Sequence, residues 1–120
     1  MNDLTMGVAE SRFADIIWEN EPISSSELVK RSNDLLQWKK STAFTVLKRL
    51  CNKGIFQNQN GVVSSLITRD EFYSAQSEQF VEETFNGSLP AFLAAFTSRK
   101  KLSDKEIEEI RKLIDEHKEG

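Results

Sequence analysis

The chain has 120 residues, a hydrophobic fraction of 38% and a formal net charge of −3, which fits one compact domain, or a small domain with an appendage that shares its core with a partner chain. Cys51 is the only cysteine, so an internal disulfide is excluded and a cysteine-based metal site is disfavoured. No apolar run approaches the roughly 18 residues of a membrane helix, and the N-terminus lacks the basic and apolar regions of a signal peptide, so we expect a cytoplasmic protein without membrane insertion.

Two helices are predicted in the first third of the chain. Apolar residues recur at helical spacing from about Val8 to Trp18, which indicates the first helix. Pro22 interrupts it, because proline disfavours helix at the preceding residue and supplies no amide donor. Ser24 opens a capping box, so a second helix is expected directly after it. We interpret the following sequence SNDLLQW, residues 32–38, as a connecting turn.

The third predicted helix lies within WKKSTAFTVLKRLCNKG, residues 38–54. Gly54 ends it, since glycine readily adopts the left-handed conformation that terminates helices. Two short strand-like runs then surround QNQNG, in which Asn60 and Gly61 favour a tight hairpin turn. The second and third helices together with this hairpin predict a winged helix-turn-helix, over residues 1–68.

Three more helices are predicted in residues 69–120, so the fold class is mainly α. They run from Thr68 to Phe85, around Pro90 in PAFLAAF, and from Ser103 to about Lys118. Their apolar stripes have little left in the same chain to cover them, and shared burial at about 25 cal/mol per Å² can sustain a dimer. We therefore expect a dimerisation region. Its candidate interface residues are Phe80, Phe85, Leu89, Phe92, Phe96, Ile107, Ile110, Leu113 and Ile114.

Positive charge is concentrated in one segment of the chain. Between Lys30 and Lys53 there are seven cations and one anion, Asp34, although the chain as a whole is acidic. Binding to a polyanion depends on local charge more than on total charge, so this segment is a candidate for nucleic-acid binding. A solvated, lysine-rich surface is the alternative interpretation of the same charge.

On a helical wheel the third helix separates into a core face and a polar face. Its core residues are Ala43, Val46, Leu47 and Leu50, with Cys51 as a small apolar residue at the margin. In a helix-turn-helix, the start of the second helix approaches base edges in the major groove. We therefore expect two groups of DNA-binding residues. Ser41, Thr42, Phe44 and Thr45 would face bases, and Lys39, Lys40, Lys48 and Arg49 would neutralise phosphates.

Some of these residues have simpler alternatives. Ser41 and Thr42 could merely cap the helix. Phe44 could fold back on Trp38 as an apolar clasp, whereas an outward Phe44 would suit a thymine methyl group. For Trp38 itself, a structural anchor between helices is favoured over a DNA contact.

The ordered set of segments ADIIW, PISSSELV, WKKSTAFTVLKRLCNKGIF, FNGSLPAFLAAF and LSDKEIEEIRKLID resembles the penicillinase-repressor family, also called BlaI/MecI/CopY-type repressors. The resemblance spans about residues 7–115. It implies a homodimeric transcriptional repressor whose winged helix binds a dyad-symmetric operator in double-stranded DNA and whose C-terminal helices form the dimer interface. In the β-lactam branch, a membrane sensor-transducer protease system leads to cleavage before a phenylalanine. The matching bond here is Ala95–Phe96.

Three departures from the family pattern bear on function. Ala95 stands where well-known members have asparagine, a difference that would affect cleavage of the Ala95–Phe96 bond. No cysteine follows Cys51, which argues against the copper-sensing branch, and no cofactor is expected. The wing residues Gln57, Asn58, Gln59 and Asn60 include no cation, so wing contacts to phosphate would rely on amides.

Two other classes of function compete with a repressor. The acidic total charge and the uncharged wing favour a winged-helix protein-interaction module without DNA binding as the main alternative. An enzyme is disfavoured, because the sequence contains no nucleophile–base pair and no glycine-rich phosphate loop.

Overall fold

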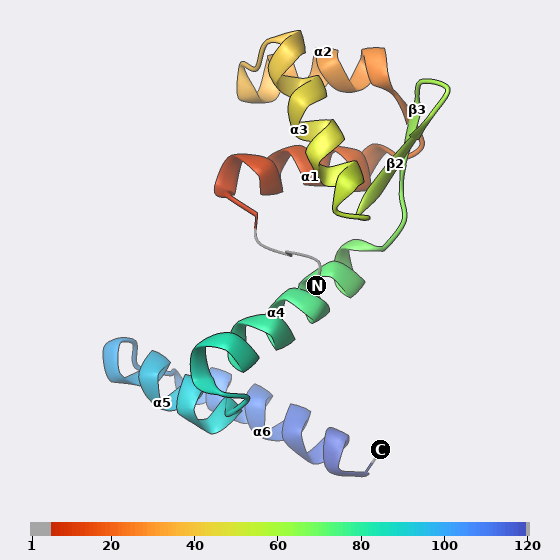
Figure 1. Ribbon diagram of the computed structural model, residues 1–120. Coiled ribbons are helices and arrows are strands. Elements are labelled where there is room, and N and C mark those ends of the chain that lie inside the picture. The colour runs from red at the N-terminus through yellow and green to blue at the C-terminus, as the bar shows by residue number, and fades with distance from the viewer. Residues whose placement is uncertain (1–5, 120) are drawn as a thin grey trace. The chain divides into compact units, whose positions relative to one another are not determined.

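The computed structural model describes residues 6–119 (Figure 1). The chain divides into two compact units, one ending at Gln79 and one beginning at Phe80. The elements are α1 (Val8–Asn20), β1 (Ile23–Ser24), α2 (Ser25–Leu36), α3 (Lys40–Asn52), β2 (Phe56–Gln59), β3 (Val62–Ser65), α4 (Arg69–Phe85), α5 (Leu89–Arg99) and α6 (Asp104–Glu119). This order confirms the mainly helical winged helix-turn-helix, with α2 and α3 as the helix pair and the β2–β3 hairpin as the wing.

The start of α2 follows the predicted capping box, but its end does not follow the prediction. The Ser24 hydroxyl accepts a hydrogen bond from the Glu27 amide at 3.1 Å. The interpretation of residues 32–38 as a turn is wrong for residues 32–36, which are helical. Ser32 is buried and donates its hydroxyl back to the Val29 carbonyl at 3.0 Å, so a residue typical of turns is accommodated inside the helix. The helix ends at Leu36 and is capped by Gln37, which has the left-handed φ of 60°.

The wing belongs to a three-stranded antiparallel sheet in the order β1-β3-β2. Val63 pairs with Ile23 of β1 and with Asn58 of β2, so β3 is the central strand. Asn60 and Gly61 have φ values of 54° and 82°, the left-handed pair that a two-residue hairpin turn requires. The predicted hairpin is confirmed.

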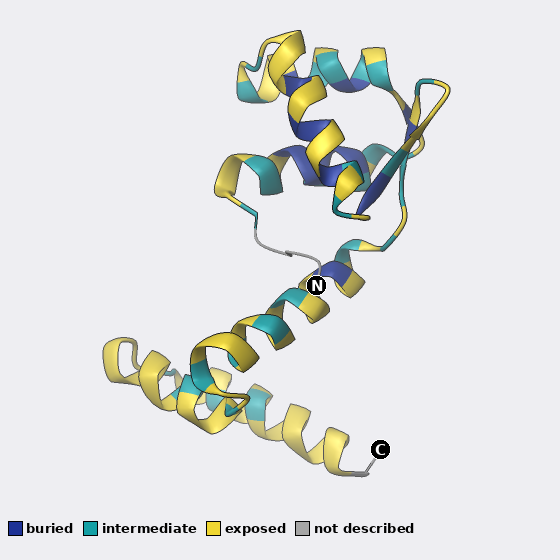
Figure 2. Cartoon of the chain, in the orientation of Figure 1, coloured by how far each residue is buried: buried dark blue, intermediate teal, exposed yellow. Residues whose placement is uncertain are grey.

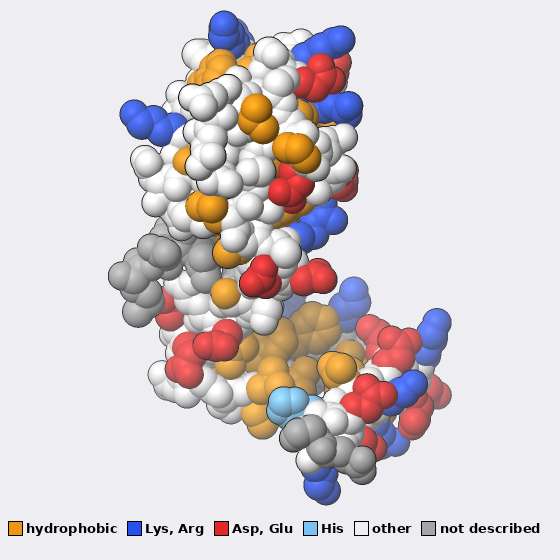
Figure 3. All heavy atoms as spheres, turned by 90° about the vertical axis from the view of Figure 1, so that its right-hand side faces the viewer, with side chains coloured by type: hydrophobic (Ala, Val, Ile, Leu, Met, Phe, Trp, Pro, Cys, Tyr) orange, Lys and Arg blue, Asp and Glu red, His pale blue; other side chains and the backbone are white. Residues whose placement is uncertain are grey.

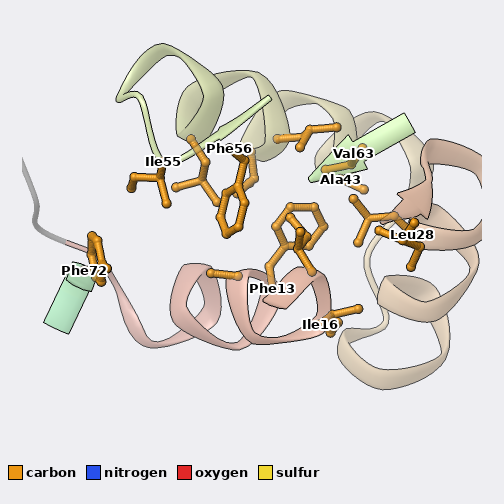
Figure 4. Packing of buried hydrophobic residues seen from close by; sticks show 14 residues of the cluster. Phe13, Ile16, Leu28, Ala43, Ile55, Phe56, Val63 and Phe72 are labelled. Carbon is orange, nitrogen blue, oxygen red and sulfur yellow. The ribbon is translucent and has the colours of Figure 1, made fainter. Parts of the chain in front are cut away.

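One hydrophobic core holds the first unit together (Figure 4). Phe13 and Ile17 of α1, Leu28 of α2, Leu50 of α3 and Phe56 of β2 are each at most 1% exposed. The apolar faces of α1, α2 and α3 and of the hairpin therefore pack against one another in a single core, which fixes the wing beside the three helices.

The first turns of α4 also pack on this unit. Phe72 is fully buried, and the Trp18 indole lies against it with ring centroids 5.7 Å apart. Thr68 and Glu71 form a capping box in both directions, and the hydrogen bonds from Thr68 lower the pKa of Glu71. The compact unit thus extends into α4, whereas the division into DNA-binding and dimerisation domains at residue 68 stays a prediction.

The second unit consists of the end of α4 with α5 and α6. Asn86 and Gly87 have positive φ and end α4, and Ser88 caps α5 by accepting the Ala91 amide at 3.1 Å. Within the described residues, neither α5 nor α6 contains a buried side chain (Figure 2). Among residues 6–119, every helix is too short or too polar to cross a bilayer.

Candidate nucleic-acid interface

The third helix, α3, is seated by the face that the sequence predicts. Ala43, Val46, Leu47 and Leu50 are at most 7% exposed, and Cys51 is half-buried at their margin. Partial burial raises the pKa of the Cys51 thiol, which keeps it neutral among apolar neighbours. The predicted core face is confirmed, and the opposite face of the helix is open to solvent.

The turn that leads into α3 is fixed by backbone and ring contacts. The Gln37 amide donates to the Asn33 carbonyl at 2.9 Å, and the Asn33 side chain donates to the Trp38 carbonyl at 3.0 Å. The Trp38 indole stacks on Phe13 of α1 with ring centroids 5.2 Å apart. Trp38 is therefore a structural anchor, as expected, and it sets where α3 begins.

The first turn of α3 carries hydroxyls that do not cap it. Lys39 occupies the cap position and makes no side-chain hydrogen bond there, so the interpretation of Ser41 and Thr42 as caps is wrong. Both hydroxyl residues lie two and three positions after the cap and are exposed. The first amide groups of a helix lack intrahelical acceptors, and the helix dipole favours an anion beside them.

Thr45 lies one turn after Ser41 on the same exposed face. Its hydroxyl donates to the Ser41 carbonyl at 2.8 Å. A hydroxyl has one proton and two lone pairs, so this bond uses the donor and leaves acceptor capacity facing outward. In this arrangement Thr45 suits an amino group, such as adenine N6 or cytosine N4 in the major groove.

Phe44 does not form the alternative clasp with Trp38, whose ring lies on Phe13. Phe44 is instead 37% exposed, and the Lys40 ammonium lies 6.0 Å from its ring centroid. A cation over an aromatic face is a weak attraction at an exposed site. The exposed ring is available for an apolar contact beside the hydroxyls of Ser41 and Thr45.

The predicted cations do not have equivalent surroundings. Lys39, Lys40 and Lys48 are exposed. Arg49 is half exposed, and its guanidinium lies 3.5 Å from the carboxylate of Glu10 in α1. The sequence prediction did not include Glu10, and no local motif could have revealed it, because the pair forms only when α1 packs beside α3.

The wing amides are largely occupied with each other. The Gln57 side chain donates to the Ser64 hydroxyl and accepts from Gln59, both at 3.1 Å. The Asn58 side-chain oxygen Oδ1 accepts a hydrogen bond from the Gly61 backbone amide at 3.1 Å. These bonds stiffen the hairpin, and Asn58, Gln59 and Asn60 are all exposed at its tip.

Comparison with known proteins agrees with this geometry. The family model described as penicillinase repressor matches residues 6–116. A penicillinase repressor of Bacillus licheniformis is 27% identical over 114 residues, which cover 92% of this chain and 89% of that protein. The methicillin resistance regulatory protein MecI of Staphylococcus aureus (strain Mu50 / ATCC 700699) is 26% identical, with 88% and 89% covered. A penicillinase repressor of Staphylococcus aureus is 24% identical, with 92% and 91% covered.

The family match covers nearly the whole chain, and the fold places a winged helix at its N-terminal side. The expected resemblance is thereby confirmed, and with it a regulatory rather than an enzymatic role. This chain belongs to the penicillinase repressor family of DNA-binding transcriptional repressors.

Proposed function

We propose that this repressor acts as a homodimer that binds a dyad-symmetric operator in double-stranded DNA through α3. The observation that carries the proposal is the exposed face of α3. Ser41, Thr45 and Lys48 lie there opposite the buried face, and Phe44 and Lys40 are exposed on the flank beside them. Hydroxyl and aromatic groups at the start of such a helix reach base edges, and lysines beside them neutralise phosphates. Because the proposed operator is chromosomal or plasmid DNA, we expect the repressor to act in the cytoplasm.

The second unit supports the dimer. Phe80, Leu89, Phe96, Leu113 and Ile114 are between 44% and 67% exposed in the single chain. Figure 3 shows hydrophobic side chains gathered on the face of this unit that is turned to the viewer. An apolar surface of this kind is typical of an interface that a partner covers. A second copy of the chain would cover it and bring two α3 helices to two half-sites.

An aromatic cluster joins the helices of this unit. The rings of Phe80, Phe85 and Phe92 lie in mutual edge contact with centroids 5.7 to 6.0 Å apart, and Phe96 lies 6.1 Å from Phe92. Because the described residues of α5 and α6 bury no side chain in the single chain, association with a second copy would add much to the stability of the unit.

Release by proteolysis in the C-terminal region is part of the proposal. Ala95 and Phe96 lie in the middle of α5 and are exposed. A helical bond must unfold locally before a protease can cut it, and a helix without buried side chains opens at low free-energy cost. A membrane sensor-transducer protease system would supply the cut, which would weaken the dimer and free the operator.

The alternative is a winged-helix module that binds a protein instead of DNA. The observation that favours it is the wing, which carries no cation and exposes Val62 to 47% and nearby Leu66 to 53%. A positively charged wing would have added phosphate contacts, whereas an apolar one suits a protein surface.

Two measurements on the purified chain test the proposal against this alternative. Sedimentation velocity at micromolar concentration reports the dimer, and fluorescence anisotropy with a labelled mixed-sequence duplex in dilute salt reports DNA binding. We expect a dimer that binds the duplex, with affinity falling steeply as salt rises. A monomer would contradict the proposed dimer. A chain that ignores DNA in dilute salt would contradict the proposed DNA binding and favour the protein-interaction module.

A further inference from the structure

Glu10 and Arg49 form a pair that links α1 to the flank of α3. The Arg49 Nη1 atom lies 3.5 Å from Glu10 Oε2. That oxygen is buried and accepts no hydrogen bond within the described part of the chain. A buried carboxylate oxygen without a donor is costly, so the guanidinium beside it is its main compensation. The α1 dipole favours an acid in the first turn of the helix, but it does not explain why this one faces Arg49.

The same pair leaves Arg49 able to bind a second anion. A guanidinium carries five N–H donors in a planar fork, and the carboxylate approaches one nitrogen of it. The Arg49 side chain is 50% exposed, while the Glu10 side chain is only 21% exposed. The carboxylate is therefore the more buried partner, and half of the Arg49 side chain stays open to solvent.

Holding an arginine in place has a consequence for binding. A free arginine side chain loses much rotamer freedom when it contacts a phosphate, and one that is already held loses less. The Glu10 carboxylate would also repel a nearby phosphate, but salt screens that repulsion at a wet surface. The positioning effect is retained, because it depends on where the guanidinium lies and not on a long-range field.

We propose that Glu10 is a positioning residue, which holds the Arg49 guanidinium for contact with a backbone phosphate of DNA. The inference rests on the proposed DNA binding by α3. It assigns Glu10 a function in binding although the residue carries the same sign of charge as the ligand and lies on a different helix from the predicted contacts.

The test is the salt dependence of binding to a labelled mixed-sequence duplex. Glu10→Gln removes the charge and keeps the shape, whereas Glu10→Asp keeps the charge and withdraws the carboxylate by one methylene. For both variants we expect severalfold weaker binding and a slope of log affinity against log salt that is lower by about 0.9, the value of one lost phosphate contact. Thermal unfolding checks that each variant is folded.

Two controls separate positioning from charge and from packing. Glu19→Gln makes the same change of net charge on the same helix, at a carboxylate that faces Arg69 at 3.3 Å. Its slope should equal that of the wild-type chain. In an Arg49→Ala background, Glu10→Asp should leave the slope unchanged, because there is no guanidinium left to position.

The outcomes are distinct. A lower slope for both Glu10 variants, absent in the Arg49→Ala background, supports the inference. Tighter binding by Glu10→Gln, or an unaltered slope for Glu10→Asp, overturns it and makes Glu10 a mere countercharge. If the wild-type chain binds no DNA in dilute salt, the proposed function fails and this inference fails with it.

Discussion

The indole of Trp38 lies on the phenyl ring of Phe13, with an interplanar angle of 26° and centroids 5.2 Å apart. This stack ties the turn of the helix-turn-helix to α1. Because Lys39 and the start of α3 follow Trp38 directly, the position of the exposed α3 residues depends on it. The contact thus joins the core of the fold to the surface that is proposed to bind DNA.

Replacing Trp38 by alanine should lower the free energy of unfolding by about 3 kcal/mol, since a large side chain is lost from a packed contact. Trp38→Phe keeps a ring against Phe13 and should cost no more than about 1.5 kcal/mol. Urea denaturation at one fixed protein concentration measures both. A loss below about 0.5 kcal/mol for Trp38→Ala would show that the stack is not an anchor.

Lys40→Ala and Lys48→Ala should each weaken binding to every DNA sequence alike. Each should lower the salt slope by about 0.9, because one phosphate contact is lost. Lys105→Ala, in α6, removes the same charge away from α3 and serves as the control. The measurement is anisotropy titration over a range of salt concentrations. Salt slopes equal to that of the Lys105→Ala control would show that Lys40 and Lys48 do not contact phosphates.

Thr45→Val and Phe44→Ala should instead change which sequences are preferred. Valine keeps the shape of Thr45 and removes the acceptor oxygen, so discrimination should fall by about 1 kcal/mol or more at one base pair. Phe44→Ala should reduce preference at a thymine. Affinities for a selected duplex and for mixed-sequence DNA measure the effect. Equal losses on both would argue against base reading by these residues.

Leu113→Asp should convert the dimer into monomers and abolish tight operator binding. Leu113 is 67% exposed in the single chain, so a charge there leaves the monomer intact but is costly in an apolar interface. Lys112→Asp places the same residue at the neighbouring exposed position and is the control. Sedimentation velocity compares them. A Leu113→Asp protein that remains dimeric would place the interface elsewhere.

Much of the fold could be predicted because its signals are local. Capping boxes at Ser24, Thr68 and Ser103 each set a helix start through hydrogen bonds within three residues. The Asn60-Gly61 turn needs only two left-handed residues, and the core face of α3 follows from helical periodicity.

The remaining features depend on tertiary contacts. The end of α2 was mispredicted because Ser32 has turn propensity, yet the folded core buries it inside a helix. The Glu10–Arg49 pair joins two helices far apart in sequence, so no motif marks it. The internal bonding of the wing amides also depends on the strand register that pairs Gln57 with Ser64. The DNA-binding and dimerisation roles of the named residues stay predictions.

The most direct test of the central claim is selection of bound duplexes from a random-sequence library by the purified wild-type chain. A dimer that presents two α3 helices should enrich an inverted repeat whose half-sites lie about one or two helical turns apart, roughly 10 or 20 base pairs. Enrichment of a single unrepeated half-site, or of no sequence at all, would contradict the account.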